Sequence, residues 1–322
     1  MMRIVSALLL ITVLGCPQPG RTESPPYDYP FTNPYEATLM GVPRDLEVAL
    51  PAAVPTQDVT LTVFPERTIP AVFWYERGLV CSLAYQDHAA PLLFVIGGAG
   101  ARYDAPIMGK LQKLLHRAGF HVLAISSPTH MDFIVNAGTG LPGNAAQDAQ
   151  DLYRVMTLAH AAVRTEIAVS SFALAGYSLG AFHAAFVAKR DAVEQRFNFT
   201  RVLLINPPVR LLDAVSALDC LLVENVPGGM KNFDGWLRSM LVQLVAPGAG
   251  PARPGAYMIS DLYRRLPRTN ANFKAILGLA FRMVAADMIF TADVMNGGGY
   301  ITPTHARLTP TTSLTRYAMV AY

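Results

Sequence analysis

One serine in this sequence has neighbours that could make it a nucleophile. Residues 172–186 read FALAGYSLGAFHAAF, with Ser178 between Gly176 and Gly180. An apolar run precedes the serine, and small and aromatic residues follow it at helical spacing. A serine on a sharp strand-to-helix turn needs small residues two positions before and after it, because bulkier ones would collide with the adjacent strand and helix. The spacing therefore predicts a hydroxyl that projects from such a turn. A serine that is only part of a turn is the alternative.

Strands and helices alternate around this serine. Antiparallel strands are expected within 59–66 and 71–85, buried strands at 91–98 and 120–126, and further strands at 172–177 and 201–208. Helices are expected at 105–118, from Asn144 to about Arg164, and at 179–190. This alternation predicts an α/β fold, with a mostly parallel central sheet, helices on both faces and antiparallel N-terminal strands.

Residues 59–208 resemble the α/β-hydrolases, in strand order and in two motifs. The first motif is the GYSLG turn at Ser178, and the second is IGGAG at 96–100, which ends an earlier central strand. The resemblance implies that Ser178 is the nucleophile and that backbone N–H groups stabilise the oxyanion. By position, these donors are Leu179 and Ala99, with Gly98 the next candidate. A plain strand-to-helix turn is the alternative for IGGAG.

In one position this chain departs from the family. Gly97 stands where many α/β-hydrolases have a histidine before the glycine. This departure weakens the assignment to a particular subfamily, whereas the oxyanion role uses only the backbone.

A serine nucleophile needs a base, usually a histidine that an acid orients. The family order is serine, then Asp or Glu, then histidine, and only His183 and His305 follow the serine. His183 lies inside the helix that follows, which points it away from the turn. His305 is therefore the candidate base, with Asp287 or Asp293 as the acid. Our hypothesis, however, is a C-terminally incomplete chain with the acid and the base beyond Tyr322, because two strands of the family pattern are unaccounted for and TRYAMVAY is an apolar, β-prone end.

The N-terminus reads as an export and anchoring signal. Residues 1–16 are MMRIVSALLLITVLGC, whose apolar stretch is too short to span a bilayer of ~30 Å. Its end resembles the lipobox of bacterial lipoproteins, which implies that Cys16 carries palmitate or a similar lipid. The resemblance places the protein at the periplasmic face of a bacterial membrane, with the outer membrane favoured because Pro17 follows. Ordinary secretory cleavage and an uncleaved anchor are the alternatives.

Two further segments flank the expected strands and helices. Residues 17–45 are rich in proline and predict a tether, whose later, aromatic half we expect to lie on the domain. The domain itself is expected at 46–322. Within it, 209–295 lacks strand patterns and predicts a helical cap after the sixth strand. Arg282 and Asp287 argue against a membrane span there. The cap either covers the pocket and favours apolar acyl groups or packs as ordinary core.

Composition excludes several classes of function. Among the 322 residues 15% are charged, and the net charge of +3 comes without a basic run, so nucleic acid is not an expected partner. The three cysteines form no CxxC pair and the histidines are scattered, so no metal site is expected. Whether Cys81 pairs with Cys220 stays open.

These patterns predict a membrane-anchored serine hydrolase that cleaves a carboxylic ester through an acyl-enzyme on Ser178. No cofactor is implied, and the substrate is a small-molecule or lipid-like ester. The rival hypothesis is a non-catalytic lipoprotein that uses the same scaffold to bind a ligand or an envelope partner. A haloperoxidase or an acyltransferase on this fold would share the nucleophile.

Overall fold

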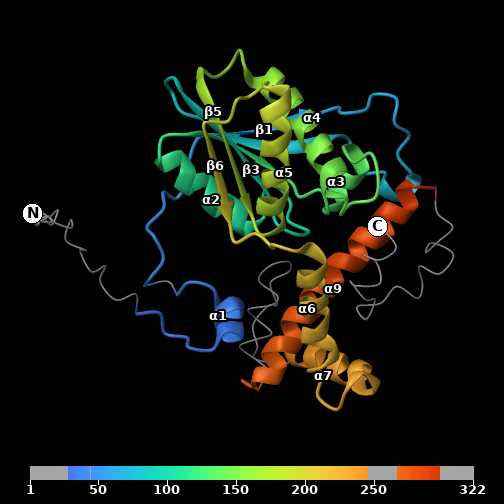
Figure 1. Ribbon diagram of the computed structural model, residues 1–322. Helices are drawn as coiled ribbons and strands as arrows, with labels where there is room; N and C mark the ends of the chain where they lie inside the picture. The colour runs from blue at the N-terminus through green and yellow to red at the C-terminus, as the bar shows by residue number, and fades with distance from the viewer. Residues whose placement is uncertain (1–27, 44, 246–266, 298–322) are drawn as a thin grey trace, which may run out of the picture.

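A mixed sheet forms the centre of the molecule (Figure 1). The computed structural model describes residues 28–43, 45–245 and 267–297. The strands are β1 (Thr56–Leu61), β2 (Leu79–Ala84), β3 (Ala90–Ile96), β4 (His121–Ile125), β5 (Val169–Tyr177) and β6 (Arg201–Ile205), in the order β1-β2-β4-β3-β5-β6. Strands β3 to β6 are parallel, whereas β1 and β2 are antiparallel to their neighbours. This confirms the expected mostly parallel sheet with antiparallel N-terminal strands.

Helices cover both faces of the sheet. They are α2 (Pro106–Arg117), α3 (Met131–Asn136), α4 (Ala145–Val163) and α5 (Leu179–Glu194). In β3, Phe94 belongs to the apolar cluster that includes α4 and α5, while Val95 belongs to the cluster that includes α2. Because successive side chains of a strand point to opposite faces, a strand covered on both sides must be apolar throughout. This explains the continuous run in β3.

The helix ends follow local sequence signals. The Asn144 side chain accepts a hydrogen bond from the N–H of Gln147 and caps α4, as expected. Gly119 follows α2 with a φ of +91°, a conformation that glycine adopts without strain.

The segment 71–85 is a strand only in its second half. Residues Ala71–Phe73 form a 3-10 turn, and the extended chain begins at Leu79. Phe73 is buried and its ring contacts that of Phe290, while Trp74 is 75% exposed. Tertiary packing of Phe73 thus overrides the β propensity of this aromatic run.

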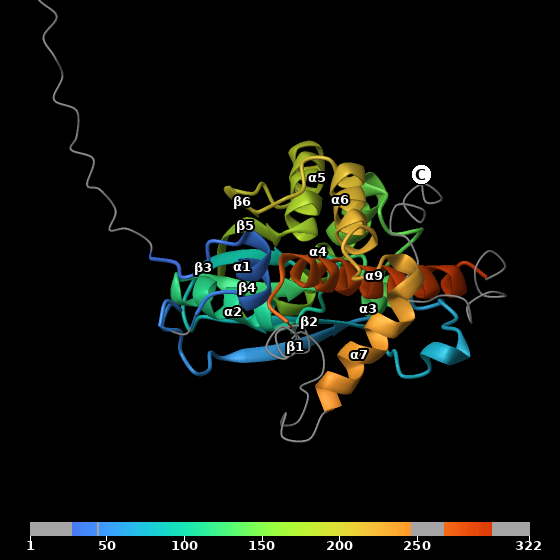
Figure 2. The ribbon, with the colours of Figure 1, turned by 90° about the horizontal axis from the view of Figure 1, so that it is seen from below.

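The described part of the cap contains three long helices, as expected for 209–295. They are α6 (Leu211–Val223), α7 (Phe233–Val245) and α9 (Asn270–Met295). Together with α1 (Pro34–Met40), they enclose an apolar cluster of their own that includes Leu39, Leu222, Phe233, Trp236, Met240, Phe273 and Ile276. Figure 1 shows this group on one side of the sheet, and Figure 2 shows α9 running between α6 and α7.

Helix α1 falls inside the stretch whose composition predicts a tether. Asn33 caps it by accepting hydrogen bonds from the N–H groups of Tyr35 and Glu36, and Pro34 occupies its first position. Leu39 is buried in the cap cluster. Residues 28–43 therefore lie on the folded domain.

Helix α9 is long and apolar enough to cross a membrane, by length and composition alone. In the structure it packs against α6 and α3 instead. The buried Arg282 donates a hydrogen bond from Nε to Asp219 Oδ1 of α6 at 2.6 Å. Gly278 lies against the backbone of Leu222, where a Cβ would collide. Helix α9 is therefore the central helix of the cap.

The two described cysteines do not pair. Cys81 is buried in β2 and Cys220 is exposed on α6. Burial raises the pKa of the Cys81 thiol. The open question of a Cys81–Cys220 disulfide is thus answered in the negative.

A buried carboxylate ties the loop before β6 to the core, and its removal should be costly. Asp191 accepts hydrogen bonds from the Tyr153 hydroxyl (2.6 Å) and from the N–H groups of Phe197 (2.9 Å) and Phe199 (3.2 Å). Asp191→Ala leaves three donors without this acceptor, and we expect about 3 kcal/mol lower stability in urea denaturation. The control is Asp87→Ala, whose side chain is 98% exposed and pairs with His88 at the surface, so the stability should stay close to that of the wild type. Equal stabilities of the two variants would contradict this role.

Candidate active site

Ser178 sits at a sharp turn between β5 and α5. Its φ is +54° and its ψ is −122°, in a region that residues other than glycine rarely adopt. Its N–H donates to the carbonyl of Ile205 at the end of β6 (2.8 Å), and its carbonyl accepts from the N–H of Ala181 (3.0 Å). These bonds hold a strained backbone in place, so that the side chain leaves the turn toward open space.

Two glycines make this turn possible. A Cβ on Gly176 would overlap the carbonyl of Gly180, and a Cβ on Gly180 would overlap the carbonyls of Ile96 and Gly97. The start of α5 therefore lies directly against the end of β3. No side chain fits at either position, which is the physical reason for glycine two residues before and two after Ser178.

The IGGAG segment packs against the serine. Within it, the N–H of Gly97 donates to Ile125 O (3.0 Å), that of Gly100 to Thr129 Oγ1 (2.9 Å), and that of Ala101 to Gly98 O (2.9 Å). Among the described residues, this leaves the N–H groups of Gly98 and Ala99 without a partner.

These free donors lie near the serine. A Cβ added at Gly98 would lie only 3.2 Å from Ser178 Cβ. Leu179 is the first residue of α5, so its N–H has no acceptor within the helix and lies at the positive end of the helix dipole. Ala99 and Leu179 both line the cavity beside Ser178. The structure thus brings together four of the residues named from the sequence: Ser178, Leu179, Ala99 and Gly98.

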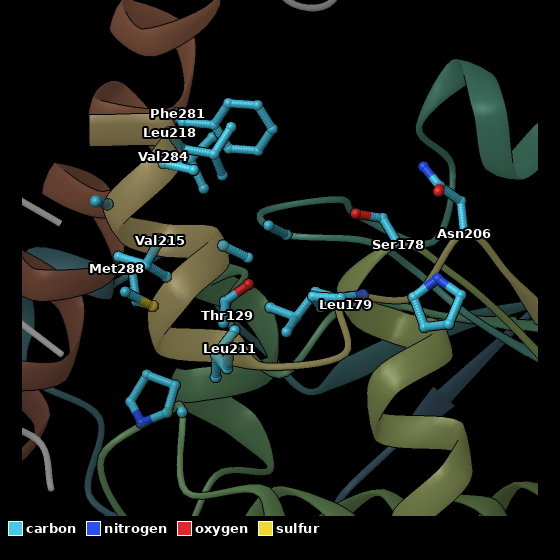
Figure 3. A pocket seen from close by; sticks show the side chains of 18 residues that line it. Thr129, Ser178, Leu179, Asn206, Leu211, Val215, Leu218, Phe281, Val284 and Met288 are labelled. Carbon is cyan, nitrogen blue, oxygen red and sulfur yellow. The ribbon is translucent and has the colours of Figure 1, made fainter. Parts of the chain in front are cut away.

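A cavity of about 420 Å³ opens in front of Ser178 (Figure 3). Its lining comes from the loops after β3, β4, β5 and β6, the loop between α3 and α4, the start of α5 and the cap helices α6 and α9. The residues are Ala99, Thr129, Pro142, Gly143, Ser178, Leu179, Asn206, Pro207, Pro208, Leu211, Ala214, Val215, Ala217, Leu218, Phe281, Val284, Ala285 and Met288. Only Thr129, Ser178 and Asn206 contribute polar side chains, and no charged side chain from the described residues lines it.

Asn206 is a site residue that sequence reasoning missed. It follows β6 with a φ of +51° and lines the cavity. Figure 3 shows its amide on the same side of the cavity as Ser178. The signal was the position of an asparagine directly after an apolar strand, since the carboxyl ends of parallel strands share one edge of the sheet.

No histidine of the described residues lines the cavity. His183 is fully buried, and its Nε2 lies 3.1 Å from Asp148 Oδ2 of α4. It therefore points away from the turn, as expected. His305, the candidate base, lies outside the described residues.

The candidate acids both lie on α9, and neither lines the cavity. Asp293 is buried. Burial raises the pKa of Asp287, and the positive charge of His130 opposes this effect. His130 itself caps α3, with Nδ1 2.6 Å from Asp132 Oδ1.

The strand order and the turn at Ser178 together identify the fold. The serine follows the fifth strand, the glycine-rich loop follows the third, and helices cover both faces. These are the features that the resemblance implies. The chain has the α/β-hydrolase fold.

Comparisons with known proteins found solved structures that are distantly similar to this chain. No protein-family model and no curated protein matches this chain. An esterase from Pyrococcus furiosus is 16% identical with a TM-score of 0.39, over 62% of this chain and 63% of that one. A probable hydrolytic enzyme from Pseudomonas aeruginosa is 17% identical with a TM-score of 0.33, over 75% and 69% of the two chains.

Other similar structures are matched over a smaller share of their length. Est1E from Butyrivibrio proteoclasticus is 14% identical with a TM-score of 0.32, over 44% of this chain and 51% of that one. The chain thus spans about half the length of this protein. At such identities the likeness concerns the fold alone.

The two glycines of the turn should not tolerate a methyl group. In Gly180→Ala the new Cβ overlaps backbone oxygens that cannot move without displacing β3, so we expect little folded protein or a loss of more than about 3 kcal/mol. The control is Gly109→Ala inside α2, where a Cβ meets nothing within 4 Å and should add about 0.5–1 kcal/mol through helix propensity. Thermal melts of the two proteins test this. An unchanged melting temperature in Gly180→Ala would refute the close packing.

Proposed function

We propose that this protein is a membrane-anchored serine hydrolase that cleaves a carboxylic ester through an acyl-enzyme on Ser178. The hydroxyl oxygen attacks the ester carbonyl carbon while its proton passes to the base. The negative charge that forms on the carbonyl oxygen is stabilised by the N–H groups of Leu179 and Ala99. Collapse of this intermediate expels the alcohol, which takes up the proton, and water then releases the acid from the acyl-enzyme.

One observation carries this proposal. The backbone of Ser178 is strained, with a positive φ. Ser178 lines the same cavity as Ala99 and Leu179, whose backbone N–H groups have no acceptor among the described residues. A turn serine without a chemical role would need neither the strain nor the donors beside it. The two donors together could lower the barrier by several kcal/mol, since removal of one such donor costs about 2.7–4 kcal/mol in a well-studied enzyme.

Within this chain, the base that we assign to the reaction is His305. The assignment comes from the family order of serine, acid and histidine, with Asp287 or Asp293 as the acid. Asp287 is the better placed of the two along α9, because its neighbour Met288 lines the cavity.

A second candidate function rests on a different observation. No described histidine reaches the cavity, which would suit a scaffold that binds a ligand or an envelope partner without turnover. In that case the apolar cavity would be the binding site and Ser178 would only position the ligand.

A fluorophosphonate probe separates the two functions. We expect the detergent-solubilised full-length protein to be labelled, and Ser178→Ala to lose labelling and at least about 10³-fold of its esterase rate. The matched control is Ser170→Ala, which changes an exposed serine on the same strand. This variant should keep both the labelling and the esterase rate. Folded protein that neither reacts with the probe nor hydrolyses esters would favour the binding scaffold.

Anchoring is part of the proposal and is tested separately. Its support is the lipobox-like sequence that ends at Cys16. Cells grown with a palmitate analogue should label the protein, and Cys16→Ala should abolish the label and release the protein from the membrane fraction. Cys220→Ala serves as the control, because this exposed thiol lies on α6 of the folded cap. Unchanged labelling in Cys16→Ala would refute lipidation at this residue.

A further inference from the structure

We propose that the cap helices α6 and α9 form the binding site for an uncharged, medium-length acyl chain, so that the substrate is an ester of a medium-chain fatty acid. This inference rests on the proposed function, and it names the acid half of the substrate. It follows from the shape, lining and rigidity of the cavity in front of Ser178.

The far wall of the cavity is apolar. Figure 3 shows Leu218, Phe281 and Val284 grouped together across the cavity from Ser178, with Val215 and Met288 beside them. These side chains come from one face of α6 and one face of α9. A charged group placed among them would lose its hydration without gaining a partner. The wall therefore selects against charged or strongly polar acyl groups.

Small residues leave room along α6. Ala214 and Ala217 both line the cavity, between the larger Leu211, Val215 and Leu218. At about 30 Å³ for a group the size of a water molecule, the volume of 420 Å³ holds roughly a dozen such groups. An acyl chain of about eight carbons with its ester oxygens is of this size, whereas an acetyl group would leave most of the cavity empty.

The cap is fixed relative to the catalytic loop, so the wall keeps its place. Val284 of α9 lies so close to Gly100 that a Cβ there would be 2.5 Å from Val284 Cγ1. Gly100 has a φ of +63° and its N–H is bonded to Thr129. The Arg282–Asp219 ion pair joins α9 to α6 on the other side. A preformed apolar wall binds a chain without the cost of ordering the cap.

Asn206 and Ser178 lie at the other end of the cavity and orient the ester (Figure 3). Asn206 lies on the side of Ser178, away from the apolar wall (Figure 3). With the carbonyl oxygen at the N–H groups of Leu179 and Ala99, the acyl chain lies toward α6 and α9. The alcohol half then lies toward Asn206, where the amide can contact a hydroxyl or an ether oxygen.

The chain-length profile of hydrolysis tests the wall. With p-nitrophenyl esters from acetate to palmitate, we expect kcat/KM to rise about fourfold per methylene up to about octanoate and to fall for palmitate. Ala214→Phe fills the cavity and should lower the octanoate-to-acetate ratio of kcat/KM at least tenfold. The matched control is Leu212→Phe, on the same helix but outside the lining and 52% exposed, which should keep the ratio.

A second pair of variants, on α9, tests the effect of a larger cavity. Met288→Ala enlarges the cavity and should move the optimum to longer chains, while Met283→Ala, exposed on the same helix, should not. A flat chain-length profile, or the same ratio in Ala214→Phe and Leu212→Phe, would overturn the proposal.

A binding assay keeps this inference separate from the proposed function. The uncharged, non-hydrolysable ketone 2-nonanone has the chain length of an octanoyl group, and isothermal titration calorimetry with it reports on the cavity whether or not Ser178 is reactive. We expect this ketone to bind the wild-type protein and Leu212→Phe alike, and Ala214→Phe at least tenfold more weakly. Binding without hydrolysis would refute the hydrolase and retain the acyl site. Hydrolysis of acetate with equal affinity for the ketone in both variants would refute the acyl site and retain the hydrolase.

Discussion

The contact between the start of α5 and the end of β3 is the constraint on which the site depends. It is made backbone to backbone, with Gly180 against the carbonyls of Ile96 and Gly97. This contact brings the glycine-rich loop after β3 within reach of Ser178, which lies two residues before Gly180. This one contact therefore positions both the Ser178 hydroxyl and the N–H donors beside it. A side chain at position 180 would push the start of α5 away from the glycine-rich loop.

The cap uses the same kind of contact a second time. Gly278 lets α9 lie against the backbone of α6 at Leu222, and Gly100 lets Val284 lie against the catalytic loop. Because α9 touches the loop at Val284 and α3 elsewhere along its length, the cap and the sheet share one cavity instead of forming independent units. The polar end of this cavity thus comes from the ends of β5 and β6, and the apolar end from the cap helices.

Sequence patterns predicted most of the sheet because each of its elements carries a local signal. Buried parallel strands must be apolar on both faces, and Asn144 and Gly119 mark helix ends with their own chemistry. The patterns failed where distant packing decides the structure. Phe73 leaves the expected strand because it packs against Phe290, more than 200 residues away along the chain. Asn206 follows an apolar strand, but that position alone does not assign it to the site, and only the adjacency of β5 and β6 places it beside Ser178.

The turn and its donors were predictable for a different reason. Glycine at 176 is required by contacts within five residues, with Gly180 and Ala181, and glycine at 180 by the end of β3, whose IGGAG sequence carries its own signal. A base is not fixed in this way, because it reaches the serine from another part of the chain. His183 is closest in sequence, yet helical geometry turns it toward Asp148.

Two of the described histidine–aspartate pairs, those with a buried or partly buried carboxylate, show that such pairing does not by itself make a catalytic base. His130 with Asp132 and His183 with Asp148 each satisfy a helix end or a buried carboxylate, and neither histidine lines the cavity. A base for Ser178 must lie at the carboxyl edge of the sheet, on the open side of the serine that α6 and α9 leave free. Asn206 already lies on that side (Figure 3). His305, the base that we propose, lies outside the described residues, so this requirement applies to whichever group takes the proton from Ser178.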